Sequence, residues 1–113
     1  MTVHVVQKPS ANKNILSAAK YGEFEFVLGD YPDLMFSPGP TVSMVRKKLK
    51  DFSDDDYLLL IGDPAAIGIC VHFALQNNRG RAKLLKWDNR EHTYYCVEVT
   101  TNVWTRRKKY KRH

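Results

Sequence analysis

One stretch decides the fold of this chain: Tyr57-Leu58-Leu59-Leu60-Ile61-Gly62-Asp63-Pro64, followed by the mainly apolar residues 65–77. The first five residues show no polar alternation, as expected for a strand that is covered on both faces. Gly62 makes the turn, Asp63 is placed to cap a helix, and Pro64 suits its first position. The helix is apolar nearly all round, so we expect it to pack deeply.

Weaker patterns lie on both sides of this stretch. Thr41 can cap a helix that runs to about Phe52 with one apolar face. Residues 23–28 alternate at period two and predict a half-buried strand, and residues 34–37 predict a second strand that closes a hairpin around the turn 29–33. Residues 82–87 and 93–99 predict a closing hairpin. Residues 3–6 are consistent with a short edge strand, and residues 15–21 with a helical turn.

These elements follow one another as β-β-α-β-α-β-β, which predicts a single compact α/β domain. A helical crossover joins the strands expected at 34–37 and 57–61, so these two strands should be parallel if they share a sheet. We therefore expect a mixed sheet with a parallel centre and antiparallel edges. The 113 residues of the chain are enough to bury one core without disulfides or metals.

The net charge of the chain is concentrated at its C-terminus. Residues 106–113 hold six of the 18 Lys and Arg and none of the 12 Asp and Glu, so the basic and acidic residues before them balance. The high isoelectric point therefore describes a short segment rather than the domain. We expect a neutral domain over residues 1–103 and a basic C-terminal tail over residues 104–113.

Several classes of protein are disfavoured by composition. The longest apolar runs, 57–61 and 65–73, are far shorter than the roughly 20 residues that cross a bilayer, and the N-terminus lacks the pattern of a signal peptide. The only two cysteines, Cys70 and Cys96, lie in apolar stretches and are typical of reduced core thiols. We expect a cytoplasmic protein with no membrane partner, no metal, no cofactor and no catalytic residue.

One edge of the predicted sheet could bind a small ligand. The loops after the strands at 34–37 and 57–61 would open on the carboxyl edge of the sheet, where helix N-termini attract anions. Ser37, Thr41 and Asp63 are the candidate residues there. The alternative is structural: Thr41 and Asp63 cap their helices, and the prolines set the shape of the loops.

Basic and aromatic residues gather towards the C-terminus. Lysine and arginine bind phosphates through charge, and aromatic rings stack on unpaired bases. The candidate nucleic-acid-binding residues in the closing hairpin are Lys83, Lys86, Arg90 and Tyr94, and those in the tail are Arg106, Arg107, Lys108, Lys109, Tyr110, Lys111 and Arg112. The alternative for the hairpin rings is packing in the core, and acidic proteins or anionic lipid are alternative partners of the tail.

Three segments carry a resemblance to a known group of proteins: Asp54-Asp55-Asp56-Tyr57-Leu58-Leu59-Leu60-Ile61-Gly62-Asp63-Pro64-Ala65-Ala66-Ile67-Gly68, Gly80-Arg81-Ala82-Lys83-Leu84-Leu85-Lys86-Trp87-Asp88 and Tyr94-Tyr95-Cys96-Val97-Glu98-Val99. The chain resembles small proteins of tailed bacteriophages, marine and cyanobacterial phages in particular, over about residues 10–100. The resemblance implies a phage-encoded protein that works in the host cytoplasm. It implies no activity and no site residue, and it does not reach the tail.

Two hypotheses of different classes follow. The first is a non-enzymatic accessory protein that binds DNA or RNA non-specifically and in a salt-sensitive manner through the tail and the hairpin. The second is a module whose neutral domain binds a host protein and inhibits or redirects it. A homodimer through an exposed final strand is compatible with both hypotheses.

Overall fold

The computed structural model describes residues 1–10, 14–29 and 32–101. Five strands form one sheet in the order β2-β1-β3-β4-β5. Their bounds are β1 (Thr2–Gln7), β2 (Glu23–Leu28), β3 (Tyr57–Leu59), β4 (Arg81–Asp88) and β5 (Thr93–Thr100). The first four strands are parallel to one another, and β5 runs antiparallel to β4. The predicted fold class, a single α/β domain with a mixed sheet, is confirmed.

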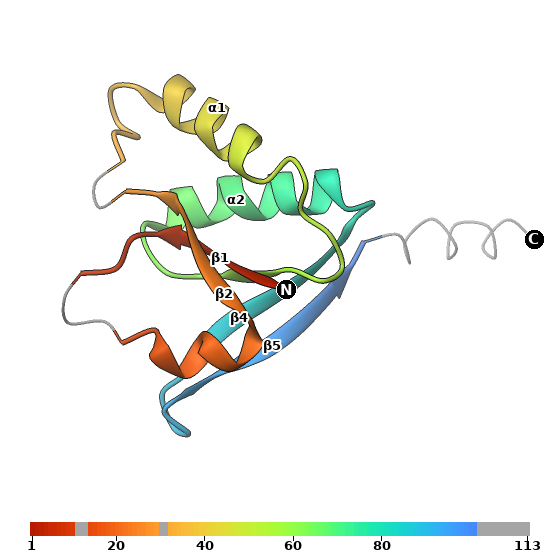
Figure 1. The fold of residues 1–113 in the computed structure, drawn as a ribbon. Helices are drawn as coiled ribbons and strands as arrows, with labels where there is room; N and C mark the ends of the chain where they lie inside the picture. The colour runs from red at the N-terminus through yellow and green to blue at the C-terminus, as the bar shows by residue number, and fades with distance from the viewer. Residues whose placement is uncertain (11–13, 30–31, 102–113) are drawn as a thin grey trace, which may run out of the picture.

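Helices cover the two faces of the sheet unequally. The α-helices α1 (Pro38–Lys48) and α2 (Pro64–Asn77) lie on one face, and the short 3-10 helix η1 (Leu16–Tyr21) lies on the other (Figure 1). Each face has its own apolar cluster, the first around Leu49 and Leu58, the second around Leu59 and Leu85. None of the helices in the described part of the chain is long and apolar enough to cross a bilayer.

The N-terminal strand β1 is an interior strand of the sheet. It pairs with β2 on one side and with β3 on the other, so its backbone is bonded along both edges. Val3 and Val5 point into the cluster beneath η1, whereas Val6 points into the cluster beneath the α-helices, and all three are fully buried. A short run of β-branched residues is typical of a strand that is buried on both faces.

The strand–turn–helix stretch is formed as its sequence predicts. Asp63 is the N-cap of α2, and its Oδ1 accepts a hydrogen bond of 2.7 Å from the backbone N–H of Ala65. Gly62 has a φ of 122°, a region that favours glycine, and a Cβ there would stand 2.5 Å from Oε1 of Gln7. The same Gln7 oxygen accepts from the backbone N–H of Asp63, which ties this turn to the end of β1.

The predicted strand at 34–37 is wrong, and with it the first hairpin. Residues 34–36 form a turn in which Oδ1 of Asp33 accepts a hydrogen bond from the backbone N–H of Phe36 at 3.0 Å. Pro38 then stands at the start of α1, so the chain enters the helix directly. The parallel neighbour of β2 is β1, and the succession β-β-α-β-α-β-β is found with β1 and β2 as its first two strands.

Two further details differ from the sequence prediction. Residues 3–6 belong to β1, an interior strand between β2 and β3, rather than to an edge. The edge strand β2 is parallel to its neighbour, so only the β5 edge is antiparallel. Helix α1 begins at Pro38 with Ser37 as its N-cap, ends at Lys48, and carries Thr41 buried within it. Thr41 therefore packs and does not cap.

A core substitution tests this arrangement. Leu59→Ala should lower the free energy of unfolding by about 2–5 kcal/mol, because Leu59 is fully buried beside β1 and its truncation leaves a cavity. Leu16→Ala, at a side chain that is 73% exposed, should change it by less than about 0.5 kcal/mol. Urea unfolding measures both values, and equal effects would contradict the assigned burial.

Candidate functional site

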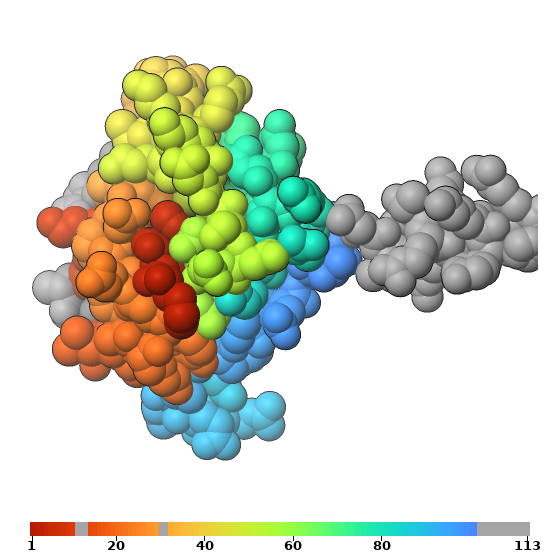
Figure 2. Space-filling model, turned by 45° about the vertical axis from the view of Figure 1, so that its right-hand side comes forward, coloured from red at the N-terminus to blue at the C-terminus, as the bar shows by residue number. Residues whose placement is uncertain are grey.

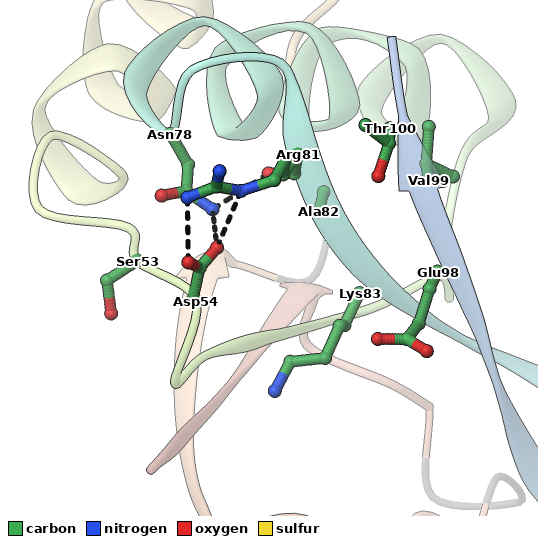
Figure 3. Close-up of a pocket in the computed structure, with 9 residues that line it drawn as sticks. All are labelled: Ser53, Asp54, Asn78, Arg81, Ala82, Lys83, Glu98, Val99 and Thr100. Carbon is green, nitrogen blue, oxygen red and sulfur yellow. Dashed lines mark hydrogen bonds and ion pairs between the residues drawn. The ribbon is translucent and has the colours of Figure 1, made fainter. Parts of the chain in front are cut away.

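A polar pocket of about 250 Å³ opens where β4 begins and β5 ends (Figure 3). Its lining comes from the loop after α1, the end of α2, and the two strands of the closing hairpin. These residues are Ser53, Asp54, Asn78, Arg81, Ala82, Lys83, Glu98, Val99 and Thr100. The pocket thus lies at the amino end of a parallel strand, opposite the carboxyl edge where ligands usually bind in such sheets.

The charged centre of the pocket is an ion pair between Asp54 and Arg81. The Arg81 guanidinium donates to both carboxylate oxygens, from Nη2 to Oδ2 at 2.8 Å and from Nε to Oδ1 at 3.2 Å. The nearly buried Asn78 donates from Nδ2 to Asp54 Oδ1 and to the backbone carbonyl of Arg81. The bonds from Asn78 and Arg81 hold the pKa of the Asp54 carboxyl below its usual value of 3.8. The Arg81 fork is therefore already occupied.

The lower part of the pocket holds a second pair of opposite charges. Lys83 and Glu98 are cross-strand neighbours on β4 and β5, and Figure 3 shows them below the Asp54–Arg81 pair. The ammonium of Lys83 stands 4.2 Å from the ring centroid of Tyr57, a cation–π contact. Two cations thus face two carboxylates, which gives the pocket no net charge and no single-sign field for a ligand.

A cationic surface lies at the end of α1. Arg46, Lys47, Lys48 and Lys50 are all exposed, and residues 38–50 include no acid. Asn77 at the end of α2 donates to the backbone carbonyl of Leu49 at 2.8 Å, which holds the ends of the two helices together. The backbone N–H of Thr101 donates to the carbonyl of Gly80, just beyond α2. The cations of α1 and the end of β5 therefore lie at the same end of the molecule (Figure 1).

The candidate ligand edge is used by the fold itself. The Asp63 carboxylate caps α2, Thr41 is 8% exposed inside α1, and Ser37 precedes α1 without a side-chain cap bond. Because residues 34–37 form no strand, Ser37 does not stand at the carboxyl end of one. The three side chains thus fill the structural roles of a cap, a packed residue and a loop residue.

The hairpin candidates are spread over different surroundings. Tyr94 is only 5% exposed and packs edge-on against Trp87 with ring centroids 5.1 Å apart, so its ring is a core group and cannot stack on a base. Burial raises the pKa of its hydroxyl. Lys83 and Lys86 point to opposite faces of β4, and Arg90 is exposed near the hairpin tip. The candidates in the tail, residues 106–112, lie outside the described residues.

The cysteines are free thiols on opposite sides of the sheet. Cys70 is buried beneath the α-helices, where desolvation raises its pKa to about 12. Cys96 is half-buried beneath η1, and burial together with Glu98 raises its pKa. A raised pKa lowers the fraction of reactive thiolate. Within the described ranges no group of three His, Cys, Asp or Glu side chains could hold a metal ion.

Two parts of this end of the molecule escaped the sequence analysis. The pocket brings Asp54 together with Asn78 and Arg81, which lie 24 and 27 positions further along the chain. No local sequence pattern indicates such a contact. The cationic end of α1 had a signal, four cations within five positions. From sequence, these four cations indicate only the solvent-exposed face of a helix.

These features define a small single-domain α/β protein with a neutral pocket and a cationic end. The chain belongs to the Phage Pam3 gp32-like protein family, whose family model matches residues 1–101. The expected resemblance to a small bacteriophage protein is confirmed. Comparison with curated proteins and with solved structures finds no match. Residues 106–113 lie outside the family match.

The Asp54 pair predicts a pH-dependent contribution to stability. Because the folded-state pKa of Asp54 is depressed, its contribution to the free energy of unfolding is fully present above pH 3.8 and is lost as the pH falls through the folded-state pKa. Asp54→Asn should therefore lower the urea midpoint at neutral pH, with a difference from the wild type that shrinks as the pH falls below 3.8. The pair is exposed and screened, so the difference should be small.

The matched control is Asp55→Asn, at a neighbouring exposed carboxylate. It removes the same charge without removing the Arg81 and Asn78 bonds. If both substitutions shift the midpoint equally, the Asp54 contacts do not stabilise the fold.

Proposed function

We propose that this protein is a phage accessory protein that binds nucleic acid non-specifically, through the basic segment 106–113 together with the exposed cations at the end of α1. The observation that carries the proposal is the segregation of charge. All six net positive charges are supplied by eight residues, while the rest of the chain is neutral. Such a segment attracts a polyanion and gains affinity by releasing the counterions of the phosphates.

The arrangement of α1 supports the proposal. Its last turn holds Arg46, Lys47 and Lys48, all exposed, and Lys50 follows directly. Because Thr101 is held beside Gly80 and the end of α2 is held beside Leu49, the basic segment follows in sequence from the same end of the domain. Of the four carboxylates in residues 51–56, Asp54 is engaged by Arg81, and Asp56 accepts a hydrogen bond from the backbone N–H of Ser53. Asp51 and Asp55 are exposed and partly offset the charge of the four cations.

The proposal depends on charge rather than on base stacking. Tyr94, the ring first considered for stacking, is buried, and the Lys83 ammonium is engaged by Tyr57. The exposed cations of the hairpin are Lys86 and Arg90, whereas Arg81 and Lys83 are partly buried. Recognition through phosphates alone is independent of sequence and falls steeply with salt, and it accepts DNA and RNA alike.

Deletion of residues 106–113 tests the proposal. Six phosphate contacts give a slope of about −5 for log affinity against log salt on a duplex, and the truncated protein should lose most of this slope. Fluorescence anisotropy with a labelled duplex and a labelled single strand, between about 0.05 and about 0.2 M salt, measures it. Unchanged affinity and slope after truncation would refute the proposal.

A charge reversal in the domain separates the contribution of α1 from that of the tail. Lys47→Glu should weaken binding and reduce the magnitude of the salt slope by about 1 or more. Lys8→Glu is the matched control, because Lys8 is an exposed lysine just after β1, at the opposite end of the parallel strands. If both variants lose the same affinity, the effect of Lys47→Glu comes from net charge alone and α1 is not part of the binding surface.

A second candidate function is supported by a separate apolar surface. Met35 and Phe36, in the turn before α1, are 81% and 82% exposed, and Met44 on α1 is 47% exposed. The bond from Phe36 N–H to Asp33 shapes this turn. Exposed apolar side chains that are close in sequence favour a protein-binding surface, here for a host protein that the neutral domain would inhibit or redirect.

The double substitution Met35→Ser with Phe36→Ser tests this second function. A host protein retained by the immobilised chain from nuclease-treated lysate should be lost in the double variant, while nucleic-acid affinity stays unchanged. Leu16→Ser, at a similarly exposed leucine on η1, is the control. Retention of the same host protein by the double variant would refute a role for this surface.

A further inference from the structure

Strand β5 forms an open edge of the sheet. Among the described strands it pairs with β4 alone, along all eight of its residues. Natural edge strands are usually protected by charge, proline, bulges or shortness. The edge strand β2 carries Glu23 and Glu25, whereas β5 carries Glu98 as its one charge and has no proline. The β5 edge is thus long and weakly protected.

One face of β5 is also apolar and only partly covered by the described residues. Tyr95 and Val97 are 41% and 37% exposed, and Val99 follows on the same face. Helix α2 packs against β1, β3 and β4, and it turns one flank to α1, as the Arg46–Phe73 and Asn77–Leu49 contacts show. Its opposite flank carries three partly buried residues at a spacing of four. These residues, Ile67, Val71 and Leu75, extend the apolar surface beside β5.

We propose that a second copy of this chain pairs with β5 in the antiparallel sense, with the two-fold axis beside Val97, to form a continuous ten-stranded sheet. A two-fold axis normal to the sheet keeps each face on its own side, so Val97 lies opposite Val97 of the partner subunit. Tyr95 then lies opposite Val99 of the partner subunit, and Glu98 lies opposite Cys96 of the partner subunit. No two like charges meet in this register.

The occupant is a second copy because the strand is complementary to itself. The register joins two apolar rows of the same length, Tyr95, Val97 and Val99 from each copy, on one face. Together with the flank of α2, this row is the apolar surface available to the dimer, which needs about 1,000 Å² of buried area in total to be specific. A foreign peptide could form the same backbone bonds, but it would need a matching apolar row.

The dimer stands independently of the proposed nucleic-acid binding. If both hold, the two copies of Thr101 lie about 27 Å apart, because eight residues of extended strand separate them. Two basic segments on one particle would then raise the avidity for a long polyanion.

The mass of the full chain in solution tests the proposal. Light scattering after nuclease treatment should give twice the mass of one chain, and Val97→Lys should give the mass of one chain with an unchanged circular dichroism spectrum. A single-chain mass for the wild type at about 100 μM would overturn the proposal, since a specific dimer of this size is populated there. A mass equal to one chain plus a bound peptide would also overturn the proposal.

Cross-linking fixes the register even if Val97→Lys fails to fold. In a Cys96→Ser background, Val97→Cys should form an intermolecular disulfide on mild oxidation, since directly opposite residues of an antiparallel pair have Cα atoms about 4.5–5.5 Å apart. Thr93→Cys, on the same strand and face, is the matched control. It should form no intermolecular disulfide, because the two copies of residue 93 lie about 27 Å apart. Equal cross-linking of both variants, or cross-linking of neither, would overturn the register.

Discussion

The structure depends on the insertion of β1 between β2 and β3. This strand comes first in the chain, yet Val3, Val5 and Val6 are fully buried and both of its backbone edges are paired. Its two faces divide the molecule into the cluster beneath α1 and α2 and the cluster beneath η1. Because a strand bonded and buried on all sides has nothing left for a partner, functional surfaces must lie at the periphery.

Three of the surfaces at the periphery differ in their chemistry. At the pocket, Asp54 and Arg81 are paired with each other, and their contacts with Asn78 join the loop after α1, the end of α2 and β4. These contacts give the pocket a structural role. The end of α1 gathers cations beside the point where the basic segment follows, and the edge of β5 presents backbone groups and an apolar row. Figure 2 shows the blue residues of β5 at the surface, next to the teal end of α2. The cations at the end of α1 and the apolar row of β5 thus lie on different elements, so a polyanion and a second copy of the chain need not compete for one surface.

Local signals predicted the parts of the fold that depend on neighbouring residues. Asp63 and Pro64 marked the start of α2, the period-two alternation of residues 23–28 marked β2, and the closing hairpin was predicted within a residue or two of its observed bounds. Long-range choices were not encoded locally: residues 3–6 look like an edge strand until their pairing with two distant strands is known. Leu34 to Ser37 resemble a strand in composition, but Asp33 and Pro38 turn the chain into α1. Tyr94 and Tyr95 alternate in burial, and sequence alone could not say which one faces the core. The basic segment was evident from its composition, because charge needs no fold to be counted.

The central claim is that the neutral domain supplies the fold, and that a polyanion binds where the cations gather. Backbone chemical shifts of labelled full-length protein, recorded during titration with a short duplex, test it most directly. The account predicts that the shift changes concentrate at the end of α1 around residues 46–50, at residues 100–101 and in the segment 106–113, and that they weaken together as salt rises. Changes centred on the hairpin tip or on the turn at residues 34–37, or persisting at high salt, would contradict it.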